Sequence, residues 1–544
     1  NNFFEKRKVM EETDDITERD FKEFFEWIFD KEITLDKELD LTLCSTQYEP
    51  YIYFPTNFKP FLQTKPMQRL KQVTHLGSVI KQNENAYHTR YAHCLGTYNN
   101  ATVFYILQYR KLAWRKRIEE EGRKIEVLAD IVESLRHDDG HNILSHGLEK
   151  IIGREYGAHE ILGNRFKCEL PETIDAINFI HPDLATNMQL VSSPSYPLIT
   201  LREGNVDFDR LDFICRDSMY LGIDSERNLM NRLIRSCSIQ TIIEDGKKKE
   251  AVVYDYEALK DIEKFLALRA KNYKDFYYST EVAAMDTEQE AFCRKFLSLD
   301  EPDGSELKEY LQACVSNGAK HLDLNEFLQW NDIRYFNELF NIATSTSNED
   351  LRDLTLDCMP TVYGLYSLGI EMIDTKKTRI EFTEQEREYI QNVKKISKPE
   401  SKLHQLFQNK NATGRKVLSF QTETELTDFE KQLSNIGILL DGTNGVFGLK
   451  SKIKVYNPKE TIYVRGNNGN IYTLEEHPER TLDLSPRYNY GIVAIPSLMR
   501  MDGVSEQKVL ETESIFKSFE LKHKPKGVNK PFKTFCFNKL NIEK

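Results

Sequence analysis

Residues 135–146, LRHDDGHNILSH, hold three histidines and two adjacent aspartates in twelve positions. Imidazole nitrogens beside carboxylate oxygens are ligands that suit a borderline divalent metal ion. Neighbouring residues of a helix point about 100° apart, so His137 and Asp138 can converge on one ion only at a helix end or a bend. His141 follows His137 by four residues, which predicts the same helical face. Gly140 interrupts the helical pattern, and we therefore expect a local distortion there.

Other histidines and carboxylates flank this stretch. Seven of the twelve histidines lie between residues 75 and 159, including His93 in YHTRYAHCLGT and His159 in REYGAHEIL. In NVDFDRLDFICRDSMYLGI, Asp209 and Asp212 are three residues apart, so a helix would place them on one face. Buried carboxylates need a counter-charge, which a metal can supply. A lone His-Asp pair would more often be a solvated helix end, but this clustering favours a metal site.

The segments that must position these groups have a helical pattern. Apolar residues recur three and four positions apart in MQRLKQV, TRYAHCLGTYNNATVFYILQYRKLAW and EVLADIVESLRH. A hairpin is predicted over 237–255, where SIQTII and EAVVYDY flank EDGKKK. We expect a long helical stretch over 259–296. Residues 300–400 stay rich in helical pattern, with breaks at 302–304 and 344–348.

The two ends of the chain differ from this middle part. An amphipathic helix is predicted after Thr17, a suitable N-cap, with an apolar stripe at Phe21, Phe24, Phe25, Ile28 and Phe29. Residues 36–60 contain prolines and are predicted to be an irregular connector. Beyond about residue 400 the pattern favours strands: KIKVYNPKETIYVRG and NIYTLEE flank a turn at 467–469, and YNYGIVAIP is another strand candidate. The tail, HKPKGVNKPFK, is basic and rich in turn residues.

Composition narrows the class of protein. The 544 residues are 40% hydrophobic and 29% charged, which is ordinary for a globular protein. No apolar run approaches the roughly 18 residues of a membrane span, so we expect no membrane partner. The nine cysteines stand singly without a CxxC, which favours structural thiols in a reducing, cytoplasmic setting. The net charge of −12 disfavours extended nucleic-acid binding but permits a local basic pocket for a polyphosphate.

Four segments, in order, resemble the HD-domain metal-dependent phosphohydrolases. More narrowly, they resemble the deoxynucleoside triphosphate triphosphohydrolases, which include dGTPases and proteins with SAM and HD domains. YHTRYAHCLGT is similar to their H-x-R-x-x-H-S-L-G-T/V segment, and LRHDDGHNILSHGLEK to L-x-H-D-x-G-H-x-P-F-S-H. HEILGNRF resembles the H-E element that follows, and DRLDFICRDSMYLGI resembles D-x-x-D-Y-x-x-R-D. The resemblance covers residues 64–280.

The resemblance implies a role for each matching residue. The implied ligands of a divalent metal (Mn, Mg, Fe or Zn) are His93, His137, Asp138 and Asp209. The implied catalytic residues are the His146–Glu149 pair, with His141 and His159 supporting the leaving group or the polyphosphate. The implied substrate-binding residues are Arg90, Arg210 and Arg269 for phosphate, Tyr277 for the nucleoside, and His75 with Leu76 beside the sugar.

Structural alternatives accompany these roles. His93 could be a core histidine, Glu149 a solvated helix residue and Tyr277 part of an aromatic core. Asp217 is expected to form a structural ion pair with Arg216. The sequence also departs from the family pattern in four places, the first being His75, where some relatives carry a glutamine that contacts the sugar. Asp139 replaces an apolar residue and could recruit a second ion or alter nucleotide choice, Asn142-Ile143-Leu144 replaces Gly-Pro-Phe, and Phe213 replaces a tyrosine.

The resemblance implies a mainly α fold whose helical HD-domain core carries a helical extension and a smaller β-containing C-terminal region. We predict an N-terminal helix and connector at 1–60, a catalytic core at 61–299, the extension at 300–400 and an α+β regulatory or oligomerisation region at 401–544. The implied activity is hydrolysis of deoxynucleoside triphosphates (dNTPs) to deoxynucleoside and triphosphate by a homo-oligomer, with dNTPs also as activators. Control of dNTP pools, including antiviral depletion, would follow. The alternatives are an HD phosphodiesterase acting on another nucleotide or a nucleic-acid end, and a non-catalytic nucleotide sensor.

Overall fold

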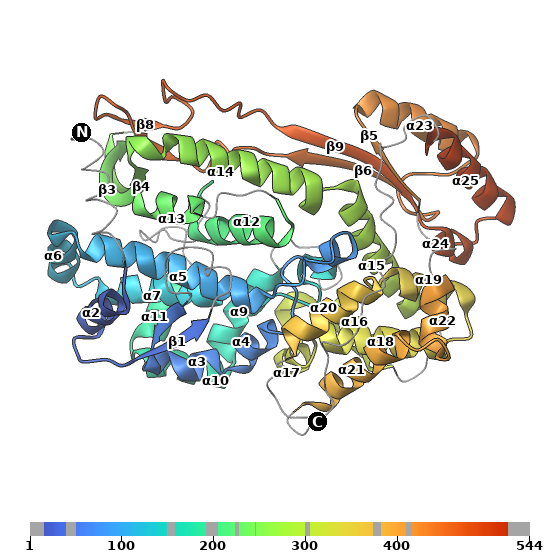
Figure 1. Cartoon of the computed structure of the whole chain (residues 1–544), viewed down its shortest axis with the longest axis horizontal. Helices are drawn as coiled ribbons and strands as arrows, with labels where there is room; N and C mark the ends of the chain where they lie inside the picture. Colours follow the sequence, from blue (N-terminus) through green and yellow to red (C-terminus); the bar gives the residue numbers. More distant parts are fainter. Residues whose placement is uncertain are drawn as a thin grey trace.

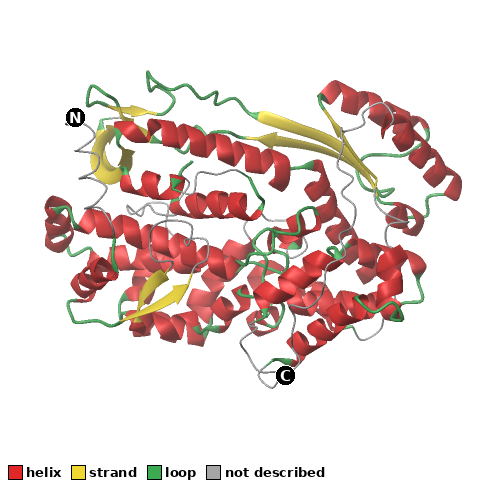
Figure 2. Cartoon of the chain, in the orientation of Figure 1, coloured by secondary structure: helices red, strands yellow, loops and turns green. Residues whose placement is uncertain are grey.

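The structure is a computed structural model that describes residues 16–39, 51–149, 158–191, 205–223, 228–244, 246–299, 305–373, 382–409 and 416–520. Helices dominate it; the sheets that contain β3–β9 lie along the top of the view, and the strands β1 and β2 lie among helices at the lower left (Figure 1, Figure 2). The predicted mainly α fold, with a helical core and a smaller β-containing region, is confirmed. The predicted break at 302–304 and the basic tail at 523–533 lie outside the described residues.

The N-terminal helix forms as the sequence predicts. Helix α2 (Glu18–Phe29) begins after Thr17, whose backbone N–H donates to the Asp20 carboxylate at 2.8 Å. Its apolar stripe packs into the protein, with four buried members: Phe21, Phe24, Phe25 and Ile28. The predicted irregular connector at 36–60 is wrong at both of its described ends, and its residues 40–50 lie outside the described residues. Strands β1 (Leu35–Leu39) and β2 (Tyr51–Pro55) pair antiparallel there, and Pro55 is tolerated because it ends β2.

Helix α5 (Arg90–Tyr109) is the central element of the N-terminal half. It packs against α7 (Lys124–Arg136) and α12 (Phe208–Tyr220). The Asp207 carboxylate caps α12 by accepting a hydrogen bond from the backbone N–H of Arg210 at 2.7 Å. Because α7 ends at Arg136, His137 and Asp138 stand at a helix end, as the convergence argument requires. The surrounding helices are α3 (Lys59–Leu62), α4 (Lys65–Leu70), α6 (Leu112–Glu120), α9 (Ala158–Glu169), α10 (Pro171–Ile180), α11 (Leu184–Val191) and α13 (Leu229–Arg235).

Gly96 allows α5 and α12 to approach closely. A Cβ at this position would lie 1.9 Å from Asp212 Oδ1 and 2.3 Å from Arg216 Nη2. We predict that Gly96→Ala lowers the free energy of unfolding by about 1–3 kcal/mol, the usual cost of overpacking. Denaturant titration measures this change. An unchanged unfolding midpoint would show that α12 can move aside without loss.

The predicted hairpin and long helical stretch are present, the latter with an interruption. Strands β3 (Cys237–Glu244) and β4 (Lys247–Tyr254) pair antiparallel. Helix α14 (Leu259–Asn272) passes into a π-helical turn over 273–277, and α15 (Thr280–Ser298) then begins anew. The stretch divides because the Ser279 hydroxyl caps α15, accepting from the backbone N–H of Val282 at 3.2 Å.

The helical extension forms the yellow and light-orange part of Figure 1. The predicted break at 344–348 is confirmed, because α18 ends at Ser345 and Asn348 caps the next helix. Its helices are α16 (Glu306–His321), α17 (Leu324–Leu328), α18 (Asp332–Ser345), α19 (Glu349–Asp357), α20 (Val362–Met372), α21 (Glu384–Ile396) and α22 (Lys402–Asn409).

The C-terminal region joins helices to two sheets. One sheet has the antiparallel order β5–β9–β6, and the other the order β3–β4–β7–β8, in which β4 and β7 are parallel. The predicted turn at 467–469 joins β7 to β8 and has Gly469 at φ +81°. The elements are β5 (Lys416–Phe420), α23 (Glu423–Asn435), β6 (Val446–Ile453), β7 (Tyr463–Arg465), β8 (Ile471–Thr473), β9 (Arg487–Ala494), α24 (Pro496–Met501) and α25 (Glu506–Glu520).

Two large hydrophobic cores meet at the middle of the molecule. The first core joins α2, α5, α7 and α10–α14 with C-terminal residues such as Val455 and Val464. The second joins α9, α15 and the helical extension with Ile143, Leu144 and Leu148. A smaller third core lies between the C-terminal sheet and helices α23 and α25. The four-part division of the chain stays a prediction. Within the described residues, no helix combines the length and apolar character needed to span a membrane.

Candidate metal centre and active site

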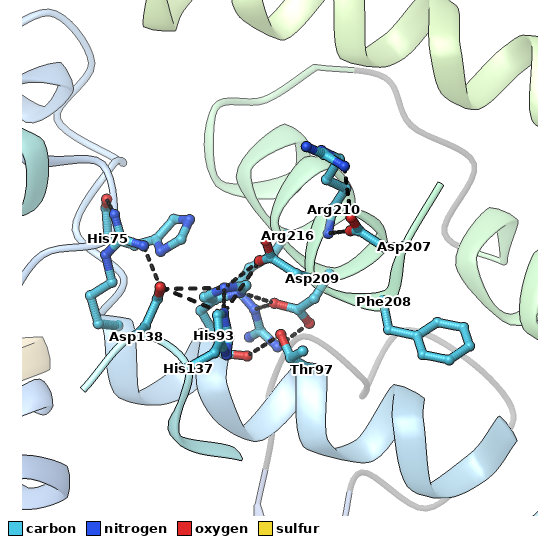
Figure 3. Close-up of polar contacts among 12 residues, drawn as sticks. His75, His93, Thr97, His137, Asp138, Asp207, Phe208, Asp209, Arg210 and Arg216 are labelled. Carbon is cyan, nitrogen blue, oxygen red and sulfur yellow. Dashed lines mark hydrogen bonds and ion pairs between the residues drawn. The ribbon is translucent and has the colours of Figure 1, made fainter. Parts of the chain in front are cut away.

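Three predicted metal ligands, His93, His137 and Asp209, lie together, and the fourth, Asp138, lies beside His93 (Figure 3). Nε2 of His93 on α5 lies 3.0 Å from Asp209 Oδ1 on α12. The same nitrogen lies 3.2 Å from His137 Nε2 and 3.5 Å from Asp138 Oδ2. His137 Nε2 is 3.4 Å from Asp209 Oδ1. These separations would let His93, His137 and Asp209 hold one cation at about 2.0–2.2 Å from each ligand atom, whereas Asp138 forms a separate group with His93 and His75.

The two ligand imidazoles are oriented by oxygen atoms behind them. His93 Nδ1 lies 2.8 Å from Asp212 Oδ2, and His137 Nδ1 lies 3.0 Å from the Ser134 carbonyl oxygen. These oxygens accept a hydrogen bond from Nδ1–H, which leaves Nε2 free to bind a metal. Arg216 holds the Asp212 carboxylate through Nε at 2.9 Å. The sequence analysis did not assign Asp212 the role of orienting His93. Its spacing of three residues from Asp209, which places both on one helical face, was the pattern that indicated it.

The charges at this point favour a cation. Burial alone would lower the pKa of His93, but hydrogen bonds to Asp209 and Asp212 outweigh burial and raise that pKa to about 10. The cluster therefore stabilises a positive charge, whether a proton or a metal ion. The Asp209 side chain is 31% exposed, so one side of the cluster is open to solvent. A catalytic metal site needs such an open side. The donor set fits a divalent cation.

The predicted catalytic residues form a second group around Glu149. Glu149 Oε2 lies 2.6 Å from His146 Nδ1, and Glu149 Oε1 lies 2.6 Å from His159 Nδ1. Burial would raise the pKa of Glu149, but these two histidines outweigh it and lower the pKa below the ordinary value. Glu149 is thus an ionised acceptor and not a solvated helix residue. The His146 side chain is 62% exposed and can reach a ligand from outside.

His141 connects the two groups. Its Nε2 lies 3.2 Å from Asp138 Oδ1, and its ring is parallel to that of His159 with centroids 4.0 Å apart. The prediction that His141 shares a helical face with His137 is wrong, because α7 ends at Arg136. The expected distortion at Gly140 is present. A Cβ on Gly140 would lie 2.0 Å from the carbonyl oxygen of His159, so only glycine allows α9 this close.

Arg90 lies among the metal ligands, with its guanidinium already bonded. Arg90 Nη1 donates to Asp138 Oδ2, Nε to Ser145 Oγ at 2.8 Å, and Nη2 to the His75 carbonyl oxygen at 3.2 Å. Arg90 therefore holds a ligand carboxylate and two loops together. Leu76, next to His75, is half-buried at the start of the 3₁₀ turn over 77–81.

Arg210 and Arg269 bond to residues other than the predicted metal ligands. Figure 3 shows Arg210 directed to Asp207 and away from His93. Arg210 Nη1 is 2.7 Å from Asp207 Oδ2 and 3.4 Å from Glu460 Oε2, which comes from the C-terminal region. Arg269 Nη1 donates to Asn205 Oδ1 at 3.1 Å. The structure therefore brings both arginines beside residues that pack against the 457–460 turn.

His75 and Tyr277 meet at Asp217. The Tyr277 hydroxyl donates to Asp217 Oδ2, and His75 Nε2 lies 3.7 Å from Asp217 Oδ1. His88, which was missed in the sequence, lies 2.7 Å from Asp217 Oδ1 through Nε2. The one feature of the sequence that indicated a role for His88 was its position in the YHTR motif. The predicted Arg216–Asp217 ion pair is wrong, because Arg216 reaches back one helical turn to bond Asp212.

Asp139 faces away from the metal ligands. Its carboxylate is bonded by Arg136 Nη2, while Arg136 Nη1 bonds Glu133 at 2.9 Å. Burial is the main reason that the pKa of Asp139 is raised to about 6. Asp139 therefore belongs to a buried charge cluster around Arg136, and these contacts do not support the expectation that it recruits a second metal ion.

The buried Arg136 cluster gives a stability prediction. Arg136→Met would leave the buried Asp139 carboxylate without its counter-charge and the half-buried Glu133 with Lys167 at 3.6 Å, so we expect the free energy of unfolding to fall by about 3–5 kcal/mol. Arg294→Met is the matched control, because Arg294 forms an exposed pair with Glu290 on α15. Loss of such a pair costs at most about 0.5 kcal/mol. Equal unfolding midpoints in urea for the two variants would contradict the prediction.

Comparison with known proteins gives distant relatives. No known protein-family profile matches the chain. It is 27% identical to an uncharacterized protein of Methanocaldococcus jannaschii, over 43% of this chain and 46% of that protein. It is 25% identical to an HD domain-containing protein of Acanthamoeba polyphaga mimivirus, over 41% and 51%. It is 26% identical to the deoxynucleoside triphosphate triphosphohydrolase SAMHD1 homolog of Dictyostelium discoideum, over 31% and 34%. The chain spans about half the length or less of these curated relatives.

Two solved structures share the fold. A phosphohydrolase from Bacteroides thetaiotaomicron superimposes with a TM-score of 0.57 at 18% identity, over 85% of this chain and all of that one. A hypothetical protein from Aquifex aeolicus superimposes with a TM-score of 0.54 at 20% identity, over 88% of this chain. These likenesses, at 18% and 20% identity, show the fold alone. Among the sequence relatives, one is named as an HD domain-containing protein and another as a SAMHD1 homolog, and the His/Asp groups of this chain could hold a metal ion.

Proposed function

We propose that this chain hydrolyses dNTPs to deoxynucleoside and inorganic triphosphate with a divalent metal ion. The observation that carries the proposal is the adjacency of two groups. The group of His93, His137 and Asp209 could bind a cation, with Asp138 Oδ2 3.5 Å from His93 Nε2. Asp138 also lies 3.2 Å from His141 of the neighbouring histidine group. The Dictyostelium discoideum relative named as a dNTP triphosphohydrolase supports the choice of substrate.

In this scheme His146 transfers a proton, and neighbouring residues orient His146 and the metal ligands. A bound divalent cation would polarise a phosphate oxygen and make water more acidic. Water oxygen would form a bond to the α-phosphorus and release a proton to solvent, while the bond from phosphorus to the 5′ oxygen breaks. His146 would give its proton to that 5′ oxygen and regain one from solvent. Glu149 accepts a hydrogen bond from His146 Nδ1, which keeps the ring in the tautomer and orientation that the transfer needs. Asp212 and Ser134 keep His93 and His137 with Nε2 toward the cation.

The wider role follows from this reaction and is part of the same proposal. Removal of dNTPs would control deoxynucleotide pools, and depletion of those pools would restrict viral replication. We propose a cytoplasmic homo-oligomer that dNTPs also activate. Measurement of cellular dNTP levels with and without infection, in cells that contain or lack the protein, tests the antiviral part.

Product analysis tests the reaction directly. The full chain is incubated with each dNTP alone and with all four together, in Mn²⁺ or in Mg²⁺, and products are separated by ion-exchange chromatography. We expect triphosphate and deoxynucleoside in equal amounts. Cleavage of cyclic nucleotides or oligonucleotides without triphosphate release would favour the phosphodiesterase alternative. Tight dNTP binding without turnover would favour the sensor alternative, and either result would overturn the proposal.

A further inference from the structure

A buried carboxylate of the helical extension contacts two loops of the candidate active site. Asp332 is the first residue of α18 and is fully buried. Its Oδ2 accepts hydrogen bonds from the Thr74 backbone N–H at 2.8 Å and from Thr74 Oγ1 at 2.7 Å. Its Oδ1 accepts from the Leu144 backbone N–H at 2.7 Å. Thr74 directly precedes His75, and Leu144 lies two residues before His146.

The loop that Asp332 holds has an unfavourable backbone conformation. Leu144 has φ 51° and Ser145 has φ 54°, so two consecutive residues with side chains occupy the left-handed region. Each such residue costs of order 1 kcal/mol or more and persists only where surrounding contacts enforce it. Ser145 Oγ also bonds the Thr74 carbonyl oxygen, which ties the two loops to each other. The conformation just before His146 therefore depends on contacts with Thr74 and Asp332.

A second buried side chain supports the same connection. Arg69 Nε donates to the Trp330 carbonyl oxygen at 2.6 Å, and Arg69 Nη1 donates to the His141 carbonyl oxygen. The Arg69 guanidinium lies 4.3 Å over the Phe327 ring of α17. Residues 327–332 of the helical extension thus contact the active-site loop at two points, His141 through Arg69 and Leu144 through Asp332.

We propose that Asp332 is a positioning residue, which fixes the loop before His75 and the loop before His146 relative to each other. It thereby sets where the His146 imidazole stands relative to the metal ligands. The inference rests on the proposed function for its effect on turnover. The orienting contacts of His93 and His137 come from Asp212 and Ser134, so the capacity to bind a cation does not depend on Asp332.

The test compares two identical substitutions in the helical extension. Asp332→Asn preserves the shape of the side chain but replaces one accepting oxygen with an amide group that cannot accept from Leu144 or Thr74. We expect kcat for triphosphate release to fall about 10–100-fold, as expected when a catalytic group is misplaced by about 1 Å. Metal content stays unchanged, and hydrogen exchange at the Leu144 amide becomes at least about tenfold faster, because an exchange-protecting bond is lost.

Asp323→Asn is the matched control. Asp323 caps α17 by accepting from the Glu326 backbone N–H at 2.8 Å, and asparagine caps helices equally well. We expect this variant to match the wild type in kcat, metal content and exchange at Leu144. A purely structural role for Asp332 predicts a different result, in which kcat falls only with the folded fraction and metal is lost in parallel.

A second pair of variants keeps the inference testable if Asp332→Asn does not fold. Thr74→Val removes the hydroxyl that donates to Asp332, and Thr74→Ser retains it. We expect slower turnover and faster Leu144 exchange in Thr74→Val only. Wild-type rates and exchange in both Asp332→Asn and Thr74→Val would overturn the inference. If the wild type releases no triphosphate from any dNTP, the proposed function fails, while exchange at Leu144 still decides the role of Asp332.

Discussion

Asp209→Asn is expected to lower triphosphate release about a thousandfold, equivalent to about 4 kcal/mol of transition-state stabilisation. Asp209 Oδ1 lies within 3.4 Å of both ligand imidazole nitrogens, so its charge is central to the site. The neutral amide is a weaker ligand for a hard or borderline cation. Metal content per chain, measured by mass spectrometry after dialysis, should fall together with the rate of product formation.

The control for this substitution is Asp428→Asn on α23. The Asp428 side chain is 65% exposed and pairs with Lys431 at 3.8 Å. The same change of charge there should leave rate and metal content as in the wild type. If Asp209→Asn retained full metal content and full rate, the four-residue cluster would not be the metal centre and the proposed mechanism would fail.

The second large effect is expected for His146→Ala, with a fall in kcat of about 10²–10⁴-fold, the typical contribution of a general acid. Glu149→Gln should give a smaller fall, because the histidine remains but loses its ionised partner at 2.6 Å. Metal content should stay at the wild-type level in both variants, since neither residue is among the proposed ligands. Initial rates at saturating dNTP, with metal analysis of the same samples, measure these effects.

Two comparisons sharpen the result for His146. His321→Ala at the exposed end of α16 is the control for loss of a surface histidine. The double variant His146→Ala with Glu149→Gln should be about as slow as His146→Ala alone, because residues that act as a unit are not additive. A double variant that multiplies the two single effects would show that Glu149 acts independently of His146.

Local patterns predicted the parts of the fold and site that depend on neighbouring residues. The convergence of His137 and Asp138 was expected only at a helix end or a bend, and α7 does end at Arg136, although that end was not predicted and contradicts the expected shared face of His137 and His141. The spacing of Asp209 and Asp212 correctly placed both on one face of α12. The β7–β8 turn follows from Asn-Asn-Gly, because glycine accepts positive φ there.

Contacts between distant segments could not be predicted in this way. Nothing in the pattern around Arg210 indicates that Glu460 would lie beside it. The parallel pairing of β4 with β7 joins segments about 210 residues apart, with Val253 opposite Tyr463. The bond from the Leu144 backbone to Asp332 likewise depends on how the helical extension packs. Such contacts arise from tertiary packing, which local spacing does not record.

The two halves of the candidate site belong to different hydrophobic cores. The helices that carry His93 and Asp209 pack in the first core, whereas the segments that carry His146 and His159 pack in the second. If warming loosened the second core first, His146 would shift while the residues that could hold a cation stayed in place. Turnover would then stop while a metal ion remained bound, and cooling would restore turnover without added metal.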